Sequence, residues 1–205
     1  MAISDNGQYT TSFRGSSSYV PLVGQILNKY EDFGNLSQVK FNSSGLVAGN
    51  PVTVKNQVGA TANEVAIENM NSVCGEITGE ATTNNNLDGF LVSSETDVVP
   101  LAGGEAYPVA GFLSFVALLG SGINLYLPAD STLEGVSLNT PIAYDFSNHV
   151  LKRATVGTDV ELPIRLKSAL VAAKKLTYSG GVASWGDCTA VLVELSNHLQ
   201  TKASS

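Results

Sequence analysis

The sequence has few of the residues that usually carry chemistry: two cysteines, two histidines and one tryptophan among 205 residues. Cys74 and Cys188 lie far apart and lack CxxC spacing, so we expect two buried free thiols, although a disulfide between them stays open. Together with His149 they offer three thiol or imidazole ligands without the spacing of a zinc site. We therefore expect no metal and no cofactor.

Familiar catalytic motifs are also missing from the sequence. It contains no GxSxG elbow, HExxH pair, Walker loop, GxGxxG loop or EF-hand loop. A Ser-His-Asp triad would have to combine His149 with Asp145 or Asp159, but a histidine beside a turn is more often simply solvated. The sequence indicates that the protein is not an enzyme, and we expect no catalytic, cofactor-binding or metal-binding residues.

Two weaker candidates for ligand binding remain. The oxygen-rich run Asn84–Asn86 with Asp88 could hold Ca²⁺, but one carboxylate would hold it weakly, and a plain loop is the favoured interpretation. Trp185 stands in a glycine-flanked stretch, residues 181–186, which we interpret as a loop. It could bind a sugar or a partner, although capping the end of the core is the commoner use of such a residue.

No hydrophobic run is long enough to cross a bilayer as a helix. The densest apolar stretch is residues 98–127, and its most continuous part, residues 109–119, is about half the roughly 20 residues that a spanning helix needs. The first ten residues have neither the basic nor the apolar region of a signal peptide. We expect no membrane association, and synthesis and use without export.

Charged residues are scarce, at 14% of the chain against roughly 25% in soluble domains, which is typical of chains that hide surface in an assembly. Residues 56–151 contain 11 of the 18 acidic residues and none of the 11 basic ones, so this block is formally at −11 and the rest of the chain at +4. The acidic block disfavours binding to nucleic acid. Six later basic residues could meet an acidic partner, unless both regions are ordinary solvated faces: Lys152, Arg153, Arg165, Lys167, Lys174 and Lys175.

The N-terminal region divides into an arm and a predicted helix. Residues 1–18 are rich in Ser, Thr and Gly, with isolated aromatic residues at Tyr9 and Phe13, and we expect an extended arm. Residues 19–30 carry apolar side chains at helical spacing, with Ser18 placed to cap and Pro21 in the first turn. This is the one helix that the sequence predicts.

The remainder of the chain has the patterns of β-strands separated by turns. In the central apolar stretch, Ile123, Leu125 and Leu127 alternate with polar neighbours, as in a strand with one buried face. Further strands are predicted at residues 39–41, 52–54, 73–78, 89–92, 142–144, 149–153, 160–167 and 188–195. Pro163 suggests an edge or a bulge in its strand. Residues 64–70 and 169–176 fit either a helix or a strand.

These patterns predict a mainly β fold, a β-sandwich or barrel-like domain, with one short N-terminal helix and an extended N-terminal arm. At this length we expect a single domain with a substantial core. Its boundaries are an arm over residues 1–18, the domain over residues 19–195 and a flexible tail over residues 196–205.

Three phrases of the sequence resemble capsid decoration proteins, or head cement proteins, of tailed bacteriophages: residues 49–54, which start a strand with Gly-x-Pro-Val, residues 161–169 (ELPIRLKSA) and the Val/Leu-rich residues 189–195. The resemblance implies a Gly/Thr/Ala-rich β core without catalytic residues. It also implies a place on the outer surface of the virion capsid, where such proteins commonly sit as trimers. This chain differs from that family in its greater length and in the predicted helix.

The expected function is therefore that of a virion structural protein that decorates and stabilises a phage head. The implied partners are the major capsid protein and further copies of the chain, with assembly in the host cytoplasm and no role for nucleic acid or membrane. Two alternatives come from other classes. One is a tail, fibre or other self-assembling virion protein, and the other is a carbohydrate-binding or hydrolytic β module that would depend on Trp185.

Overall fold

The computed structural model describes residues 20–27, 37–41, 46–55, 73–92, 113–179 and 182–197. Those ranges contain eleven strands and two short 3-10 turns. None of the helical segments in them is long and apolar enough to span a membrane. The predicted fold class, mainly β with a barrel-like domain, is confirmed.

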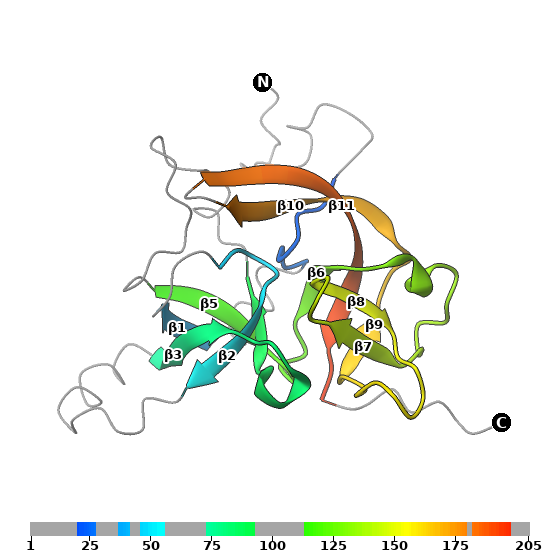
Figure 1. Ribbon diagram of the computed structural model, residues 1–205, viewed down its shortest axis with the longest axis horizontal. Helices are drawn as coiled ribbons and strands as arrows, with labels where there is room; N and C mark the ends of the chain where they lie inside the picture. The colour runs from blue at the N-terminus through cyan, green and yellow to red at the C-terminus, as the bar shows by residue number, and fades with distance from the viewer. Residues whose placement is uncertain are drawn as a thin grey trace, which may run out of the picture.

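Five strands close into a small barrel, on the left of Figure 1. Around the barrel they follow the order β1 (Ser37–Phe41), β3 (Val73–Glu80), β2 (Pro51–Lys55), β4 (Gly89–Leu91) and β5 (Leu113–Leu118). β1 and β3 run parallel, and all the other neighbouring pairs are antiparallel. Closure leaves this sheet without a free edge.

The barrel strands β4 and β5 bury both of their faces. Leu91 and Val116 pack with Val52 in the cluster inside the barrel, and each is at most 1% exposed. The residues next to them, Phe90 and Ala117, belong to the larger core outside the barrel. Because side chains alternate along a strand, burial on both faces requires the continuous apolar runs that the sequence has here.

A second sheet is built on β11 (Val182–Leu195), which is the longest strand. β10 (Val171–Ser179) pairs with its first part, and β9 (Ile164–Leu166) pairs with its last three residues. β6 (Asn124–Pro128) pairs with β11 from Ala190 to Glu194. In Figure 1 β10 and the start of β11 cross the top of the molecule, and β11 then turns down through the body. A separate hairpin consists of β7 (Ile142–Asp145) and β8 (Val150–Arg153).

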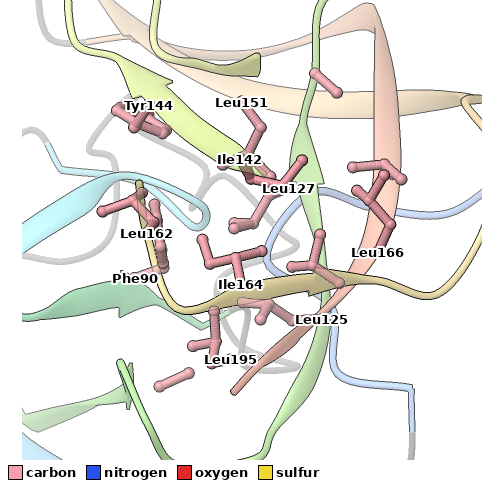
Figure 2. Packing of buried hydrophobic residues seen from close by; sticks show 14 of the residues in the cluster. Phe90, Leu125, Leu127, Ile142, Tyr144, Leu151, Leu162, Ile164, Leu166 and Leu195 are labelled. Carbon is pink, nitrogen blue, oxygen red and sulfur yellow. The ribbon is translucent and has the colours of Figure 1, made fainter. Parts of the chain in front are cut away.

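One core joins the barrel, the second sheet and the hairpin. Phe90 comes from the barrel, Leu125 from β6, Ile142 from β7 and Ile164 from β9, and all four are fully buried (Figure 2). Each such side chain contributes about 1.5–3 kcal/mol through burial. The ring of Phe90 lies 5.6 Å from that of Tyr144, at an interplanar angle of 56°, which is a favourable tilted contact. The three parts therefore fold as one unit.

The predicted helix over residues 19–30 is wrong for the part that the structure describes. Residues 21–27 have isolated bridges at Leu22 and Ile26 on either side of a turn, and they cross between two strands: the N–H of Val23 donates to the Lys174 carbonyl at 2.9 Å, and the N–H of Gly24 donates to the Tyr126 carbonyl at 2.7 Å. Gly24 has φ +80°, which a helix does not contain. The apolar side chains at helical spacing pack against different parts of the second sheet and the core instead of forming one helix face.

The strand predictions fare better. Residues 39–41, 52–54, 73–78, 89–92, 142–144, 149–153 and 188–195 all overlap strands of the structure. The predicted strand over residues 160–167 shortens to β9, which starts directly after Pro163. Among the described strands it pairs with β11 alone, which fits the edge position, one of the two alternatives that Pro163 suggested. Of the ambiguous residues 169–176, residues 171–176 are extended in β10.

The remaining boundaries fall largely on residues that the structure does not describe. The predicted arm over residues 1–18 and the ambiguous residues 64–70 lie outside the described ranges. Of the predicted tail, the first residue, Ser196, is only 8% exposed, and its N–H donates to the Glu194 carbonyl at 2.9 Å. The folded domain therefore extends at least to that residue.

Candidate interaction surface

The β10–β11 hairpin, called the ribbon below, reaches beyond the rest of its sheet. Its register runs from Val171 opposite Ala190 to Ser179 opposite Val182. β6 meets β11 only from Ala190 onward, so the first half of β11 has β10 as its only strand partner among the described residues. The ribbon is thus two-stranded over most of its length.

Among the described residues, only residues 21–23 cover the outer edge of β10, at Lys174. Both backbone groups of Lys174 bond to residues 21–27: its N–H donates to the Pro21 carbonyl at 3.0 Å and its carbonyl accepts from Val23 at 2.9 Å. Since every second residue of a strand directs its backbone groups to the same side, those of Leu176 and Tyr178 face this edge too. Within the described residues they have no backbone partner there.

The outer edge of β11 is open in the same way. The Thr189 carbonyl accepts from the N–H of Ala129 at 3.0 Å, which marks the side that faces away from β10. By the same alternation, the backbone groups of Trp185 and Asp187 face this side. In the described part of the chain, nothing pairs with them. With respect to the described residues, the ribbon therefore has two open edges, and open edges are the usual template for adding a further strand.

Two small apolar clusters hold the ribbon on the body. On one face Leu176, which is 4% exposed, packs with Val47 and the half-buried Trp185. On the other face Ala173 packs with Val23. The prediction that Trp185 lies in a loop is wrong, because it stands in β11 opposite Leu176. Its cap-like packing agrees with the structural role that we favoured over sugar binding.

The ribbon also carries opposite charges on its two strands. Nζ of Lys174 on β10 lies 2.6 Å from Oδ1 of Asp187 on β11, directly across the ladder. The Asp187 side chain nevertheless stays 86% exposed, so most of this carboxylate is open to solvent. Lys175 follows on the opposite face, across from Gly186. The outer side of β10 is thus basic, and that of β11 is acidic.

The six basic residues expected to meet an acidic partner do not form one patch. Lys152 pairs with Asp159 at 2.9 Å, and Lys167 pairs with Glu194 at 2.8 Å. With Lys174 also paired, three have a carboxylate of their own. The other three, which have no ion pair to a described residue, are spread over three strands: Arg153 on β8, Arg165 on β9 and Lys175 on β10.

Several carboxylates of the acidic block also have internal partners. Glu80 accepts a hydrogen bond from Nδ2 of Asn50 at 2.7 Å, and Asp88 accepts from the Val54 N–H at 2.7 Å. Asp130 caps a 3-10 turn, accepting from the N–H of Thr132. These acidic residues therefore help to build the fold.

The residues of the hypothetical triad do not come together. Nδ1 of His149 lies 3.0 Å from Oε1 of Glu80, without an aligned hydrogen bond between them. Asp145 instead accepts from the side chain of Asn148 at 2.8 Å, which lowers the pKa of its carboxyl. Asp159 is held by Lys152, whose hydrogen bond lowers its pKa. Neither aspartate orients His149, so the triad is not formed.

His149 and Tyr144 nevertheless have unusual conformations or environments. His149 has φ +55°, a left-handed conformation that a non-glycine residue adopts at a cost. Beside it, the hydroxyl of Tyr144 is buried without a hydrogen-bond partner, and burial, with the charges of Glu80 and Asp145, strongly raises the pKa of that phenol. Tyr144 therefore stays protonated and packs edge to face on Phe146, 5.0 Å between ring centres.

The oxygen-rich segment Asn84–Asn86 with Asp88, considered above as a Ca²⁺ site, makes hydrogen bonds within the protein. Asn84–Asn86 form a 3-10 turn, and Oδ1 of Asn86 accepts from the Thr83 N–H at 2.9 Å. Asp88 is occupied by the Val54 N–H. Among the described residues, no group of three or more histidine, cysteine or acidic side chains is placed to hold a metal ion. The favoured interpretation as a loop fits this geometry.

The two cysteines were expected to be free thiols. Cys188 is a free, half-buried thiol on β11, and burial raises its pKa above the ordinary value. Cys74 lies in β3, and its side chain is outside what the structure describes. A raised pKa leaves less of the Cys188 thiol in the nucleophilic thiolate form.

One feature that the sequence analysis missed is an ordered loop with an apolar tip. The Thr155 N–H donates to Asp159 at 2.8 Å, and the Asp159 N–H donates back to the Thr155 carbonyl at 3.0 Å. This closed loop presents Val156, which is 97% exposed, while Val160 is 56% exposed. A fixed loop that displays an apolar side chain is a candidate contact point. The signal in the sequence was a valine in a turn, where a polar residue is usual.

Comparison with known proteins gives no further guide: no protein-family model matches the chain, and no curated protein matches it.

Proposed function

We propose that this chain is a virion structural protein that decorates the outer surface of a tailed-phage head and stabilises it. The observation that carries the proposal is the ribbon with its two open edges, because such edges bind other chains by strand addition. The resemblance of three sequence phrases to capsid decoration proteins points the same way. The partners would be the major capsid protein and further copies of this chain, at the capsid surface.

The ordered loop at Val156 gives the proposal a second point of support. A valine exposed to 97% on a loop tied by its own hydrogen bonds would lose little conformational entropy on binding. We place this loop in the contact with the shell. The work of the protein is then association rather than catalysis.

Binding to phage heads tests the proposal directly. Purified chain is mixed with heads that lack it and sedimented, and the pellet is assayed for the bound chain. We expect saturable binding, weakened by deletion of residues 1–18 and by Val156→Asp. Ser147→Asp is the matched control, since it adds the same charge at an exposed turn on the other end of the β7–β8 hairpin. Absence of wild-type binding would contradict the proposal.

A tail or fibre protein is the second candidate, because two open edges also suit polymerisation. Electron microscopy of the concentrated chain separates the two functions. Tubes or fibres that form without heads would favour the second candidate, and discrete particles that bind heads would favour the first.

A further inference from the structure

Residues 20–27, the described part of the N-terminal region, do not continue along the outer edge of β10. The bridge between Leu22 and Lys174 is parallel, so continuing along β10 would bring the next residues beside Leu176. Instead Gly24, with φ +80°, turns the chain away to Tyr126 on β6. After this turn, no other described residue pairs with the β10 edge from Leu176 onward. A two-stranded ribbon is marginal on its own in water, so a further strand would stabilise it.

The two edges differ in charge, which limits what each can accept. Lys174 and Asp187 share one face of the ribbon, the first on β10 and the second on β11. If two β11 edges met antiparallel at residues 185 and 187, their two Asp187 side chains would lie diagonally across the new ladder, and two β10 edges would bring no carboxylate to Lys174. Like charges across a ladder are unfavourable, whereas a β10 edge against a β11 edge pairs a lysine with an aspartate.

We propose that copies of this chain join by strand addition, with the β10 edge of one copy against the β11 edge of the next. The backbone groups of Leu176 and Tyr178 then pair with those of Trp185 and Asp187 in the neighbouring copy. The exposed carboxylate of Asp187 lies within reach of the neighbour's Lys174, as a diagonal pair. Each copy uses two different edges, so the contact is head-to-tail and can close into a ring.

The inference deepens the proposed function and rests on it for the reason why the copies meet. A ring of copies gives a decoration protein several equivalent contacts with a shell, and linked contacts bind far more tightly than single ones. The edges also explain the ribbon itself, because every open edge in a closed ring is covered.

Charge reversal on the two strands tests the contact. We expect wild-type chain to sediment at a multiple of 21.4 kDa. Lys174→Glu or Asp187→Lys alone should weaken self-association by about tenfold or more. Mixing the two single variants should restore it, because each edge then faces the opposite charge on the other variant. Arg153→Glu is the matched control, with the same change of charge on an exposed residue of β8, and it should leave association unchanged.

The mixture separates an intermolecular contact from the internal pair of Lys174 and Asp187. Each single variant breaks the internal pair in its own chain, and mixing cannot repair it. Restored association therefore requires contact between copies. Circular dichroism and thermal unfolding establish that each variant is folded.

Tyr178→Pro tests the backbone pairing. Its N–H faces the outer edge, so proline removes a bond to the neighbour and keeps the ladder with β11, as edge strands tolerate. We expect a folded monomer. A wild-type chain of 21.4 kDa at all concentrations would overturn the inference, as would variants that keep the wild-type mass. A wild-type chain that stays monomeric but still sediments with heads would refute the ring of copies without contradicting the proposed function.

Discussion

Gly89 in β4 provides the sharpest test of the barrel. A Cβ built on Gly89 would clash with the Ala117 carbonyl oxygen and would lie 2.9 Å from Cα of Leu118, both on the neighbouring strand β5. These are backbone atoms, so no side-chain rotation relieves the clash. Gly89→Ala can be accommodated only if β4 and β5 move apart.

The size of the effect follows from what such a movement would disturb. β4 pairs with β5 from Gly89 to Leu91, and the next residue along, Phe90, is fully buried in the core. Overpacking of a tight core costs about 1–3 kcal/mol, and damage to the ladder adds to it, so we expect a loss of about 3 kcal/mol in the free energy of unfolding. For a domain of this size that loss lowers the Tm by about 6–12 °C.

Urea and thermal unfolding of the purified variants measure this loss. Gly79→Ala in β3 is the matched control, because a Cβ there meets nothing within 4 Å. It should be neutral or slightly stabilising, since alanine restricts the unfolded chain. If Gly89→Ala unfolds within about 0.5 kcal/mol of the wild type, the close approach of β4 and β5 is wrong.

Three further predictions concern single side chains. The hydrogen bond from Lys152 lowers the pKa of Asp159, so the ionised Asp159 stabilises the fold above its ordinary pKa of 3.8, and this stabilisation is lost as the pH falls below that value. Asp159→Asn should therefore flatten the acid side of a plot of Tm against pH. An unchanged slope would contradict this. Burial raises the pKa of Cys188, so peptide mapping should find it alkylated more slowly at pH 8 in the native than in the unfolded protein, whereas equal rates would refute its burial. His149 has φ +55°, which glycine adopts more readily than alanine, and both His149→Gly and His149→Ala lose the imidazole. The glycine variant should therefore be about 1 kcal/mol more stable than the alanine variant, and the reverse order would refute the left-handed conformation.

Much of the strand content could be predicted from the sequence, because it depends on local patterns. A proline followed by an alternating apolar run marks both β2 and β7, and the alternation of Leu162, Ile164 and Leu166 marks the strand around β9, all three being at most 3% exposed. The order of strands was beyond prediction. The parallel pair of β1 and β3 inside an otherwise antiparallel barrel depends on contacts between distant segments.

The false helix has a physical explanation. Leu22, Val23 and Ile26 have helical spacing, but Val23 packs on the ribbon and Ile26 on the main core, so their apolar character serves two surfaces instead of one helix face. Gly24 was the contrary signal, because it carries the turn between the two. Periodicity alone does not reveal where each side chain will pack.

The ribbon was also partly hidden in the sequence. The glycines around Trp185 suggested a loop, yet Gly186 sits within β11 and a Cβ there would meet nothing within 4 Å. Gly180 and Gly181, a pair between two β-rich runs, were the better signal, because two such residues are typical of a hairpin turn. Whether an edge of β10 or β11 is paired depends on where distant segments of the chain lie, and no local sequence pattern indicates this.

The central claim is that this protein acts by binding to a phage head, and counting bound copies tests it most directly. Heads that lack the chain are titrated with it, and the number of bound copies per major capsid protein is measured at saturation by quantitative gel densitometry and electron cryomicroscopy. The account predicts a fixed, symmetric ratio with the chain on the outer surface. Binding that never saturates, or no density on the heads, would contradict it.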